Sequence, residues 1–252
     1  MSDQQSGRNV RLSVAMAVYN GEAYLKEQVD SILAQLGESD ELILSVDPST
    51  DASDSIAREY AGRDGRVSVY IGPGRGAIRN FEDALGKTSG EYIFLSDQDD
   101  VWAENKITLC LDALKKPGVL AIMHNAILTD ETLRCTGEKL LGGRFFAGAF
   151  RNILQNKYTG CCMAFKRELL FYALPFPNSI PMHDQWLGIV ANKYGAVKYI
   201  DSPLLYYRRH GTTVTGREKA GITKKLRWRM GILYSYIRLG KKKPEARPRA
   251  AC

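Results

Sequence analysis

Residues 92–100 read YIFLSDQDD, an apolar run that ends in three carboxylates. The apolar part has the length and composition of a buried strand. Asp97, Asp99 and Asp100 follow at its expected end, with Gln98 among them. Neighbouring carboxylates repel one another, so the pattern favours a bound cation, and hard oxygen ligands select Mg²⁺ or Mn²⁺. The alternative is a solvated acidic turn in which one Asp caps a helix.

The chain before this strand alternates apolar runs with amphipathic segments. Strands are predicted at 11–18, 41–46, 66–71 and 92–95, with helices between them. This alternation indicates βαβ units and an α/β fold, with a mostly parallel, Rossmann-like sheet covered by helices on both faces. Ligands of such sheets bind beyond the carboxyl ends of the strands. The polar loops expected around one crevice are 19–22, 47–51, 72–80 and 96–100.

Asn20 is a candidate N-cap for the first helix, and Ser49, Thr50 or Asp51 for the second. Asp47 follows the second strand, where a carboxylate can accept hydrogen bonds from a nucleobase or ribose. A plain turn residue before Pro48 is the alternative.

Two further candidates lie in the second half, where strands are predicted at 119–123, 158–165 and 197–200. Asp184 begins a predicted helix at 182–194. It is either a helix cap or a general base that takes a proton from an acceptor hydroxyl, with His183 and Trp186 as an amphipathic, sugar-like setting. His210 is a candidate metal ligand, and Arg208 or Arg209 a candidate counter-charge for a diphosphate; a surface histidine beside solvated arginines is the alternative.

The 252 residues suit one large domain, or one domain with an appendage. No apolar run approaches the roughly 20 residues of a membrane span, and the N-terminus lacks a signal-peptide core. The five cysteines show neither disulfide-framework nor zinc-site spacing, which favours a reducing cytoplasm. Cys161 and Cys162 are expected to be buried small residues.

Positive charge is concentrated in the C-terminal tail. Residues 217–252 hold 12 of the 35 Lys and Arg residues but only 2 of the 28 Asp and Glu residues. An amphipathic helix is predicted at 223–238, with Leu226, Met230, Leu233 and Ile237 three or four residues apart. It either lies on an anionic membrane surface or packs on the main domain. No nucleic-acid motif accompanies the charge, so nucleic acid is not an expected partner.

Together these loops resemble glycosyltransferase family 2, the inverting group with the GT-A fold and a DXD-type acidic motif. The resemblance covers roughly residues 12–215 and is nearest to bacterial rhamnosyltransferases and other enzymes of O-antigen, capsule and cell-wall polysaccharide assembly. Ala17 stands where Pro is common, and Val46-Asp47-Pro48-Ser49 where Asp-Asp-Gly-Ser is common. The matching pieces are Ala17–Asn20 with Glu22, 47–51, Asn80, 97–102, 159–162, 183–186 and 207–210.

The resemblance implies a GT-A domain at 1–215, with a nucleotide-binding half at about 10–100 and an acceptor half at about 101–215, followed by the basic tail at 216–252. It implies Asp184 as the catalytic base. Asp99 would be the main ligand of Mn²⁺ or Mg²⁺, with help from His210, and Asp97 or Asp100 would orient the donor ribose or sugar. The expected nucleotide-sugar-binding residues are Ala17, Tyr19, Asn20, Glu22, Asp47, Asn80, Asp97 and Gln98.

The expected reaction is inverting, metal-dependent transfer from dTDP-rhamnose or a UDP-hexose to a glycan or undecaprenyl-type lipid-linked acceptor. The expected place is the cytoplasm, peripherally on the inner membrane. One alternative is a non-catalytic sugar-binding or scaffold member of the family. The other is a sugar-1-phosphate nucleotidyltransferase, but residues 17–22 lack the glycine-rich, Arg-containing loop of that class.

Overall fold

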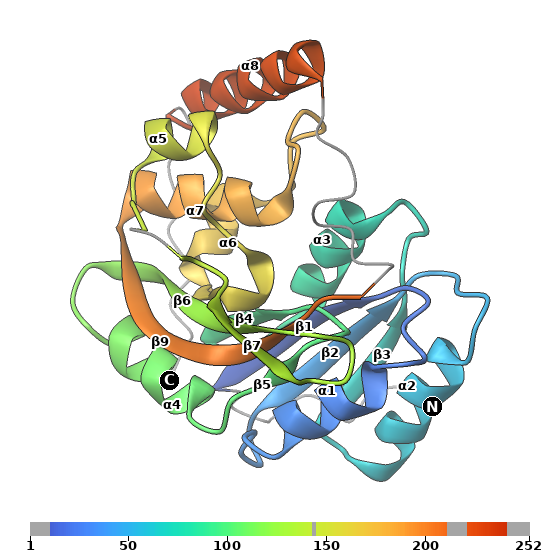
Figure 1. The fold of residues 1–252 in the computed structure, drawn as a ribbon. Helices are drawn as coiled ribbons and strands as arrows, with labels where there is room; N and C mark the ends of the chain where they lie inside the picture. Colours follow the sequence, from blue (N-terminus) through green and yellow to red (C-terminus); the bar gives the residue numbers. More distant parts are fainter. Residues whose placement is uncertain (1–10, 143–144, 211–220, 241–252) are drawn as a thin grey trace, which may run out of the picture.

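The computed structural model describes residues 11–142, 145–210 and 221–240 (Figure 1). Its first half alternates strands and helices as predicted. The predicted strands are confirmed there with shifts of one residue at their ends. The elements are β1 Leu12–Val18, α1 Leu25–Leu33, β2 Glu41–Val46, α2 Ser53–Arg63, β3 Val67–Ile71, α3 Ala77–Lys87 and β4 Tyr92–Ser96.

The second half is less regular than the sequence suggests. The predicted strand at 158–165 begins only at Met163, because residues 160–162 form a 3₁₀ turn. The strands predicted at 119–123 and 197–200 continue to Thr129 and Arg208. The elements are β5 Val101–Trp102, α4 Lys106–Leu114, β6 Val119–Thr129, β7 Cys135–Lys139, α5 Ala149–Leu154, η1 Gly160–Cys162, β8 Met163–Lys166, α6 Glu168–Ala173, α7 His183–Tyr194, β9 Ala196–Arg208 and α8 Ile222–Leu239.

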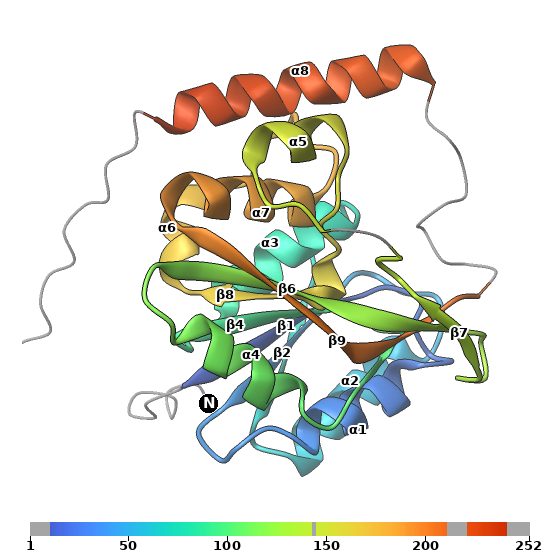
Figure 2. The ribbon, with the colours of Figure 1, turned by 60° about the vertical axis from the view of Figure 1, so that its left-hand side comes forward.

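The strands form one sheet in the order β3-β2-β1-β4-β8-β6-β9-β5, with β7 paired to β6. The strands β3, β2, β1 and β4 are parallel, as are β6 and β9. The strand β8 runs antiparallel to both β4 and β6 and so joins the two halves. Helices α1, α2 and α4 cover one face, and α3, α6 and α7 the other (Figures 1 and 2). The predicted α/β architecture is confirmed.

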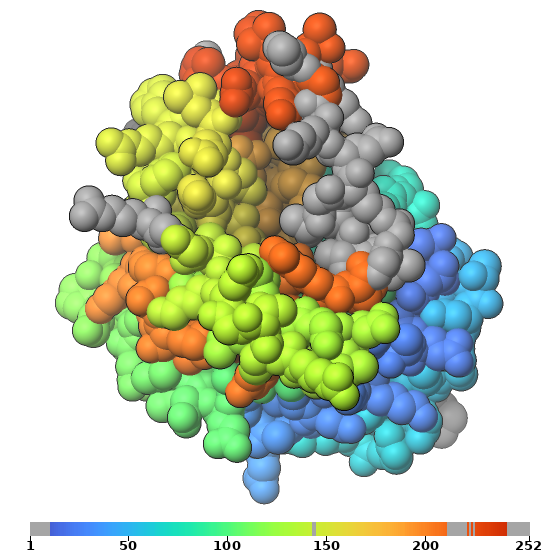
Figure 3. Space-filling model, viewed as in Figure 1, coloured from blue at the N-terminus to red at the C-terminus, as the bar shows by residue number. Residues whose placement is uncertain are grey.

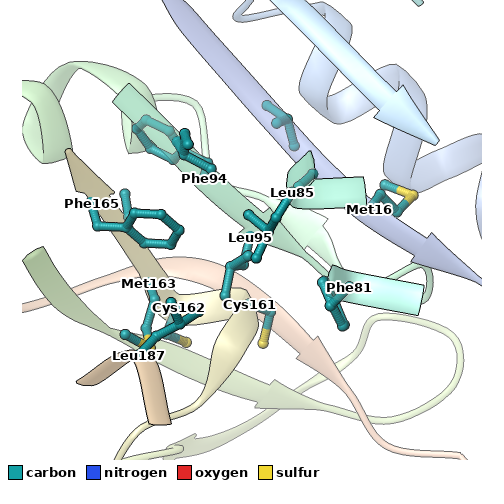
Figure 4. Packing of buried hydrophobic residues seen from close by; sticks show 14 of the residues in the cluster. Met16, Phe81, Leu85, Phe94, Leu95, Cys161, Cys162, Met163, Phe165 and Leu187 are labelled. Carbon is teal, nitrogen blue, oxygen red and sulfur yellow. The ribbon is translucent and has the colours of Figure 1, made fainter. Parts of the chain in front are cut away.

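The core is continuous across the junction of β4 and β8 (Figure 4). Phe94 and Phe165 are fully buried, and Ile93 pairs with Phe165 in the antiparallel register. Truncating either Phe to Ala would cost about 3–5 kcal/mol of stability. The strand β4 lies in the middle of the sheet. The acidic loop that follows it, residues 97–100, therefore lies at the centre of the sheet edge. Cys161 and Cys162 are free and buried in this core, as predicted.

Within the described ranges, none of the helices has both the length and the apolar character that crossing a membrane requires.

Candidate active site

The loops after β1 and β4 are joined by the side chain of Gln98. Its Oε1 accepts the Tyr19 backbone N–H at 2.8 Å, and its Nε2 donates to the Tyr19 carbonyl at 2.9 Å. A Cβ at Gly21 would lie 2.5 Å from Gln98 Oε1, so a side chain there would displace the Gln98 amide. The ring of Tyr19 remains largely exposed at the crevice. Gln98 therefore holds the β1 loop against the acidic loop.

The loops after β1 and β2 are joined in a similar way. Asn20 has φ 48°, which Asn tolerates, and its Oδ1 accepts the Thr50 N–H at 2.9 Å. Glu22 Oε2 accepts the Ala52 N–H at 3.0 Å, and Asp51 Oδ2 accepts the Glu22 N–H at 2.9 Å. The prediction that Asn20 caps α1 is wrong, because its side chain faces the neighbouring loop and α1 begins only at Leu25.

Asp47 and Asn80 meet at the carboxyl edge of the sheet, next to Ala17 at the end of β1. Asp47 Oδ1 accepts the Gly74 N–H at 2.8 Å, and Asn80 Nδ2 donates to the Val18 carbonyl at 3.2 Å. Asn80 Oδ1 is buried without a hydrogen-bond partner among the described residues. A Cβ at position 72 would lie 2.5 Å from Asp47 Oδ1 and 2.7 Å from Asn80 Oδ1. Gly72 thus lets the two polar side chains converge.

The end of β9 contacts the acidic loop. His210 Nε2 lies 2.8 Å from Asp99 Oδ2, although the two residues are 111 positions apart. The His210 ring lies 4.7 Å from the Tyr24 ring. Asp100 Oδ1 accepts the Arg208 N–H at 3.0 Å, and its Oδ2 is buried with no partner in the described part of the chain. The two predicted metal ligands, Asp99 and His210, are therefore brought together.

The carboxylates of this loop are held in conditions that disfavour their charge. Burial, followed by the charges of Asp99 and Asp184, raises the pKa of Asp97 to about 7. Burial and the charges of Asp99 and Asp97 raise the pKa of Asp100 well above its usual value. A cation bound here would relieve both the repulsion and the desolvation of the carboxylates.

Two sets of side chains are candidates for holding such a cation. Ligand atoms of Asp97, Asp100 and Cys161 lie within 4.8 Å of one another. A thiol is a soft ligand, however, and Asp100 already uses one oxygen on the Arg208 backbone. Asp99 and His210, whose side chains lie 2.8 Å apart, offer a carboxylate oxygen and an imidazole nitrogen, which suit Mn²⁺ better. We therefore favour the second set.

Asp184 lies near the start of α7 and is 6% exposed. Its Oδ2 accepts the Gly160 N–H at 3.2 Å, and its Oδ1 accepts the Gln185 N–H at 2.5 Å. The N-cap position is Met182, so Asp184 is not the N-cap residue itself, but its side chain accepts one backbone N–H of the first turn, as the helix-cap alternative expects. Burial raises the pKa of Asp184 to about 6, against the opposing effect of the two N–H donors. Such a carboxylate is ionised at neutral pH yet able to take a proton.

The predicted sugar-like setting of Asp184 is only partly present. Trp186 is buried and its Nε1 donates to the Ala173 carbonyl at 3.0 Å, so it is a core residue, not a sugar platform. His183 is buried too and stacks on Phe81 at 4.0 Å between ring centroids. Burial lowers the pKa of His183 to about 3, so its ring is neutral.

Arg208 is not a counter-charge for a ligand. It is 3% exposed and its guanidinium donates to the Asp99 and Glu131 carbonyls and to the Glu27 carboxylate. It therefore fixes the end of β9 against the acidic loop. Arg209 is exposed and stays a candidate.

Two buried polar residues support the acidic loop and were not predicted. Gln28 donates to Ser96 Oγ at 2.6 Å and to the Asp97 carbonyl at 3.0 Å. Lys106 donates to the Cys161 carbonyl at 2.7 Å and lies 4.1 Å from the Trp102 ring centroid. Burial lowers the pKa of Lys106. Each occupies an apolar stripe of its helix, and a polar residue in such a stripe is the signal that could have revealed them.

The chain matches a known protein family. The model of the family described as Glycosyl transferase family 2 matches residues 13–171. The chain belongs to glycosyltransferase family 2. Over 234 residues it is 27% identical to the dTDP-rhamnosyl transferase RfbG of Shigella flexneri, an alignment that covers 86% of this chain and 78% of RfbG.

Solved structures agree on the fold. TarS of S. aureus, in complex with UDP-GlcNAc, superposes with a TM-score of 0.71 at 16% identity, over 90% of this chain and 66% of TarS. The mannosyltransferase PcManGT of Pyrobaculum calidifontis, in complex with GDP-Man and Mn²⁺, gives 0.61 at 19% identity, over 97% and 70%. The fold is that of the GT-A glycosyltransferases. This family 2 chain spans 63% to 78% of the length of three curated relatives that it matches.

Proposed function

We propose that this glycosyltransferase moves one sugar from a nucleoside diphosphate sugar to an acceptor hydroxyl, with inversion at the anomeric carbon. The observation that carries the proposal is the proximity of two unlike carboxylate groups. Asp184 is close enough to the acidic loop for its charge to raise the pKa of Asp97. The proposed base is thus near the proposed metal ligands, and the proposed reaction needs both.

The donor nucleotide is assigned to the crevice formed by Ala17, Tyr19, Asp47 and Asn80. Asp47 has one carboxylate oxygen bonded to the Gly74 N–H, and Asn80 has an unpaired amide oxygen beside it. These acceptors suit a base with an imide N–H, which uracil and thymine share. UDP- and dTDP-sugars, including dTDP-rhamnose, are therefore the donors we propose. RfbG is named as a dTDP-rhamnosyl transferase, which supports this choice.

Asn20, Glu22 and Gln98 contribute to the donor site by fixing its loops, through the bonds described above. Asp97 and Asp100 are assigned to orienting the donor ribose or sugar. Residues of about 10–100 would then form the donor half, and residues of about 101–215 the acceptor half, of a domain at 1–215.

A divalent cation, Mn²⁺ or Mg²⁺, would be held by Asp99 and His210 with help from Asp97. When bound, it supplies positive charge that stabilises the leaving nucleoside diphosphate. The structure of PcManGT with Mn²⁺ supports this assignment.

Asp184 takes the proton of the acceptor hydroxyl as the acceptor oxygen attacks the anomeric carbon. The bond from that carbon to the diphosphate oxygen breaks on the opposite face, and the nucleoside diphosphate leaves with the bonding electrons. One displacement inverts the configuration without a covalent enzyme intermediate. The buried setting of Asp184 excludes water and raises its proton affinity, which suits a base acting near neutral pH.

The proposed acceptor is a glycan or an undecaprenyl-type lipid-linked glycan of a bacterial surface polysaccharide such as O-antigen. A lipid-linked acceptor would place the chain in the cytoplasm, working at the inner face of the membrane. The name of RfbG is consistent with this role but does not extend to the acceptor.

A donor screen tests the proposal. Release of nucleoside diphosphate would be followed from dTDP-rhamnose, UDP-galactose, UDP-glucose, UDP-N-acetylhexosamines and GDP-sugars with Mn²⁺ or Mg²⁺, using EDTA and Asp99→Ala as controls. Release from one donor that both controls abolish is the expected result. Binding of a donor without turnover under any acceptor condition would favour a non-catalytic family member, and release of pyrophosphate from a sugar-1-phosphate and a nucleoside triphosphate would favour a nucleotidyltransferase.

A further inference from the structure

The helix α8 packs on the end of the molecule remote from α1 and α2, over α5 and α7 (Figure 2). Its inner side buries Ile232, Ser235 and Leu239. Lys193 and Tyr194 of α7 donate to the α8 carbonyls of Tyr236 and Leu239 at 2.8 and 2.7 Å. The prediction that this helix packs on the main domain is therefore confirmed for its inner side.

The outer side of α8 is apolar and uncovered by any described residue. Leu226, Met230, Tyr234 and Ile237 are 57–65% exposed. They are spaced by four, four and three residues, so they lie on one face of the helix, opposite the buried side. Exposed large apolar residues that line up in this way mark an interaction surface more often than isolated ones do.

Two exposed apolar residues of α5 lie beside α8. Phe150 and Leu154 are 68% and 63% exposed. The Phe150 ring lies 6.0 Å from the Tyr236 ring, and Arg229 of α8 donates to the Leu154 carbonyl at 2.8 Å. We call the four exposed apolar residues of α8 the outer apolar face: Leu226, Met230, Tyr234 and Ile237. Figure 3 shows α8 and α5 together at one end of the molecular surface.

The charged residues of α8 have a single sign. The sequence of α8 contains five Lys and Arg residues and no Asp or Glu. Lys225, Arg227, Arg229 and Arg238 are exposed. A symmetric contact between two copies of the chain through α8 would bring these cations together, which is unfavourable. An anionic surface is the complementary partner.

We propose that the outer apolar face docks on an anionic lipid bilayer, with Leu226, Met230, Tyr234 and Ile237 in the interfacial region and the cations of α8 on lipid headgroups. The inference rests on the proposed function, since it supplies the surface from which a lipid-linked acceptor would come. Ser179, four residues before α7, hydrogen-bonds Ser235 of α8 at 2.9 Å. The docking face is thus on the outer side of α8, and the inner side of α8 contacts α7, the helix that carries Asp184.

Vesicle co-sedimentation of the full chain, without donor or metal, tests the inference separately from catalysis. We expect binding to phosphatidylcholine vesicles that contain phosphatidylglycerol, and much weaker binding to pure phosphatidylcholine. Arg227→Gln with Arg238→Gln should weaken binding about thirtyfold, because each cation near an anionic surface contributes about 1 kcal/mol. The matched control is Arg58→Gln with Arg63→Gln, two exposed arginines of α2.

An apolar pair of variants tests the other half of the face. Met230→Ser with Ile237→Ser should reduce vesicle binding at least tenfold, whereas Leu109→Ser, an exposed leucine of α4, should not. All these positions lie outside the active site, so nucleotide release from donor in solution should be unchanged. Equal binding to both vesicle types, no binding to either, or self-association that the α8 variants abolish would overturn the inference. Failure of the donor screen with vesicle binding intact would instead overturn the proposed function.

Discussion

The proposed donor side and the proposed acceptor side of the candidate active site are built differently. On the donor side, loops after β1, β2 and β4 hold one another through bonds from Asn20, Glu22 and Gln98 to backbone groups. On the acceptor side, a single buried carboxylate, Asp184, is positioned by the Gly160 and Gln185 N–H groups. A shared network loses little when one bond is removed, whereas a lone reacting group has no substitute. The two sides should therefore respond to substitution in different ways.

The largest effect is expected for Asp184→Asn. The amide keeps the shape of the side chain but cannot take a proton, so kcat should fall about 10³-fold while donor binding persists. Steady-state kinetics with the donor found in the screen would measure this. Glu168→Gln, an exposed carboxylate on α6, is the control and should be unaffected. Activity retained by Asp184→Asn would remove Asp184 from the role of base.

Asp99→Asn should lower kcat/KM about 10²-fold, because it removes a charge that holds the cation at the leaving diphosphate. Unlike Asp184→Asn, this variant should also bind the nucleoside diphosphate more weakly in the presence of Mn²⁺. Asp112→Asn on α4 is the matched exposed control. Equal Mn²⁺-dependent binding by wild type and Asp99→Asn would show that the cation is held elsewhere.

Lys106→Met should lower kcat about thirtyfold, as expected for a residue that positions the groups around a metal site. The ammonium group of Lys106 lowers the pKa of Asp97, so its loss should raise the pH at which metal-dependent activity appears. This shift would distinguish an electrostatic role from a purely structural one. Lys115→Met, at the C-cap of the same helix, changes an exposed lysine and serves as the control. An unshifted pH profile would contradict the role.

The pH profile of kcat tests the acceptor side without any substitution. The pKa of Asp184 is raised from 3.8 to about 6, so the base is ionised above pH 6 and becomes protonated below it. Turnover should fall about fivefold between pH 6 and pH 5. An acidic limb near pH 4 would indicate a solvated base and contradict the buried one.

The smallest effect is expected for Gln98→Ala. Two hydrogen bonds to the Tyr19 backbone would be lost, but the bonds from Asn20 and Glu22 would remain. A loss of about 1 kcal/mol corresponds to a rise of about fivefold in the donor KM, with kcat nearly unchanged. Gln155→Ala is the exposed control. A drop in kcat as large as that of Asp184→Asn would mean that the loops are not a shared network.

The same two sides differ in how far the sequence predicts them. From β1 to β4, each apolar run is followed by an amphipathic helix, and parallel pairing then brings the loops to one edge. The local sequence pattern is therefore sufficient to predict the strands and helices of the first half. In the second half, β6 continues through His124 and Asn125, which interrupt its apolar run yet are fully buried. Asn125 bonds Tyr199 and Asp201 of β9, partners that only the tertiary fold provides.

The candidate site follows the same division. The pairing of Asp99 with His210 was expected from the family resemblance, and the fold places the two side chains in contact. The burial of Lys106 and Gln28 could be suspected from their helical stripes, but their partners could not. The burial of Trp186 was missed because its helix is buried over most of its surface, so spacing alone did not show which side faced the site.

Calorimetric titration of nucleoside diphosphate with Mn²⁺ into wild type, Asp184→Asn and Asp99→Asn tests the division of the site most directly. The account predicts that wild type and Asp184→Asn bind with similar affinity, that Asp99→Asn binds more weakly, and that neither variant turns over donor at the wild-type rate. Absence of metal-dependent binding by wild type, or loss of binding in Asp184→Asn as large as in Asp99→Asn, would contradict it.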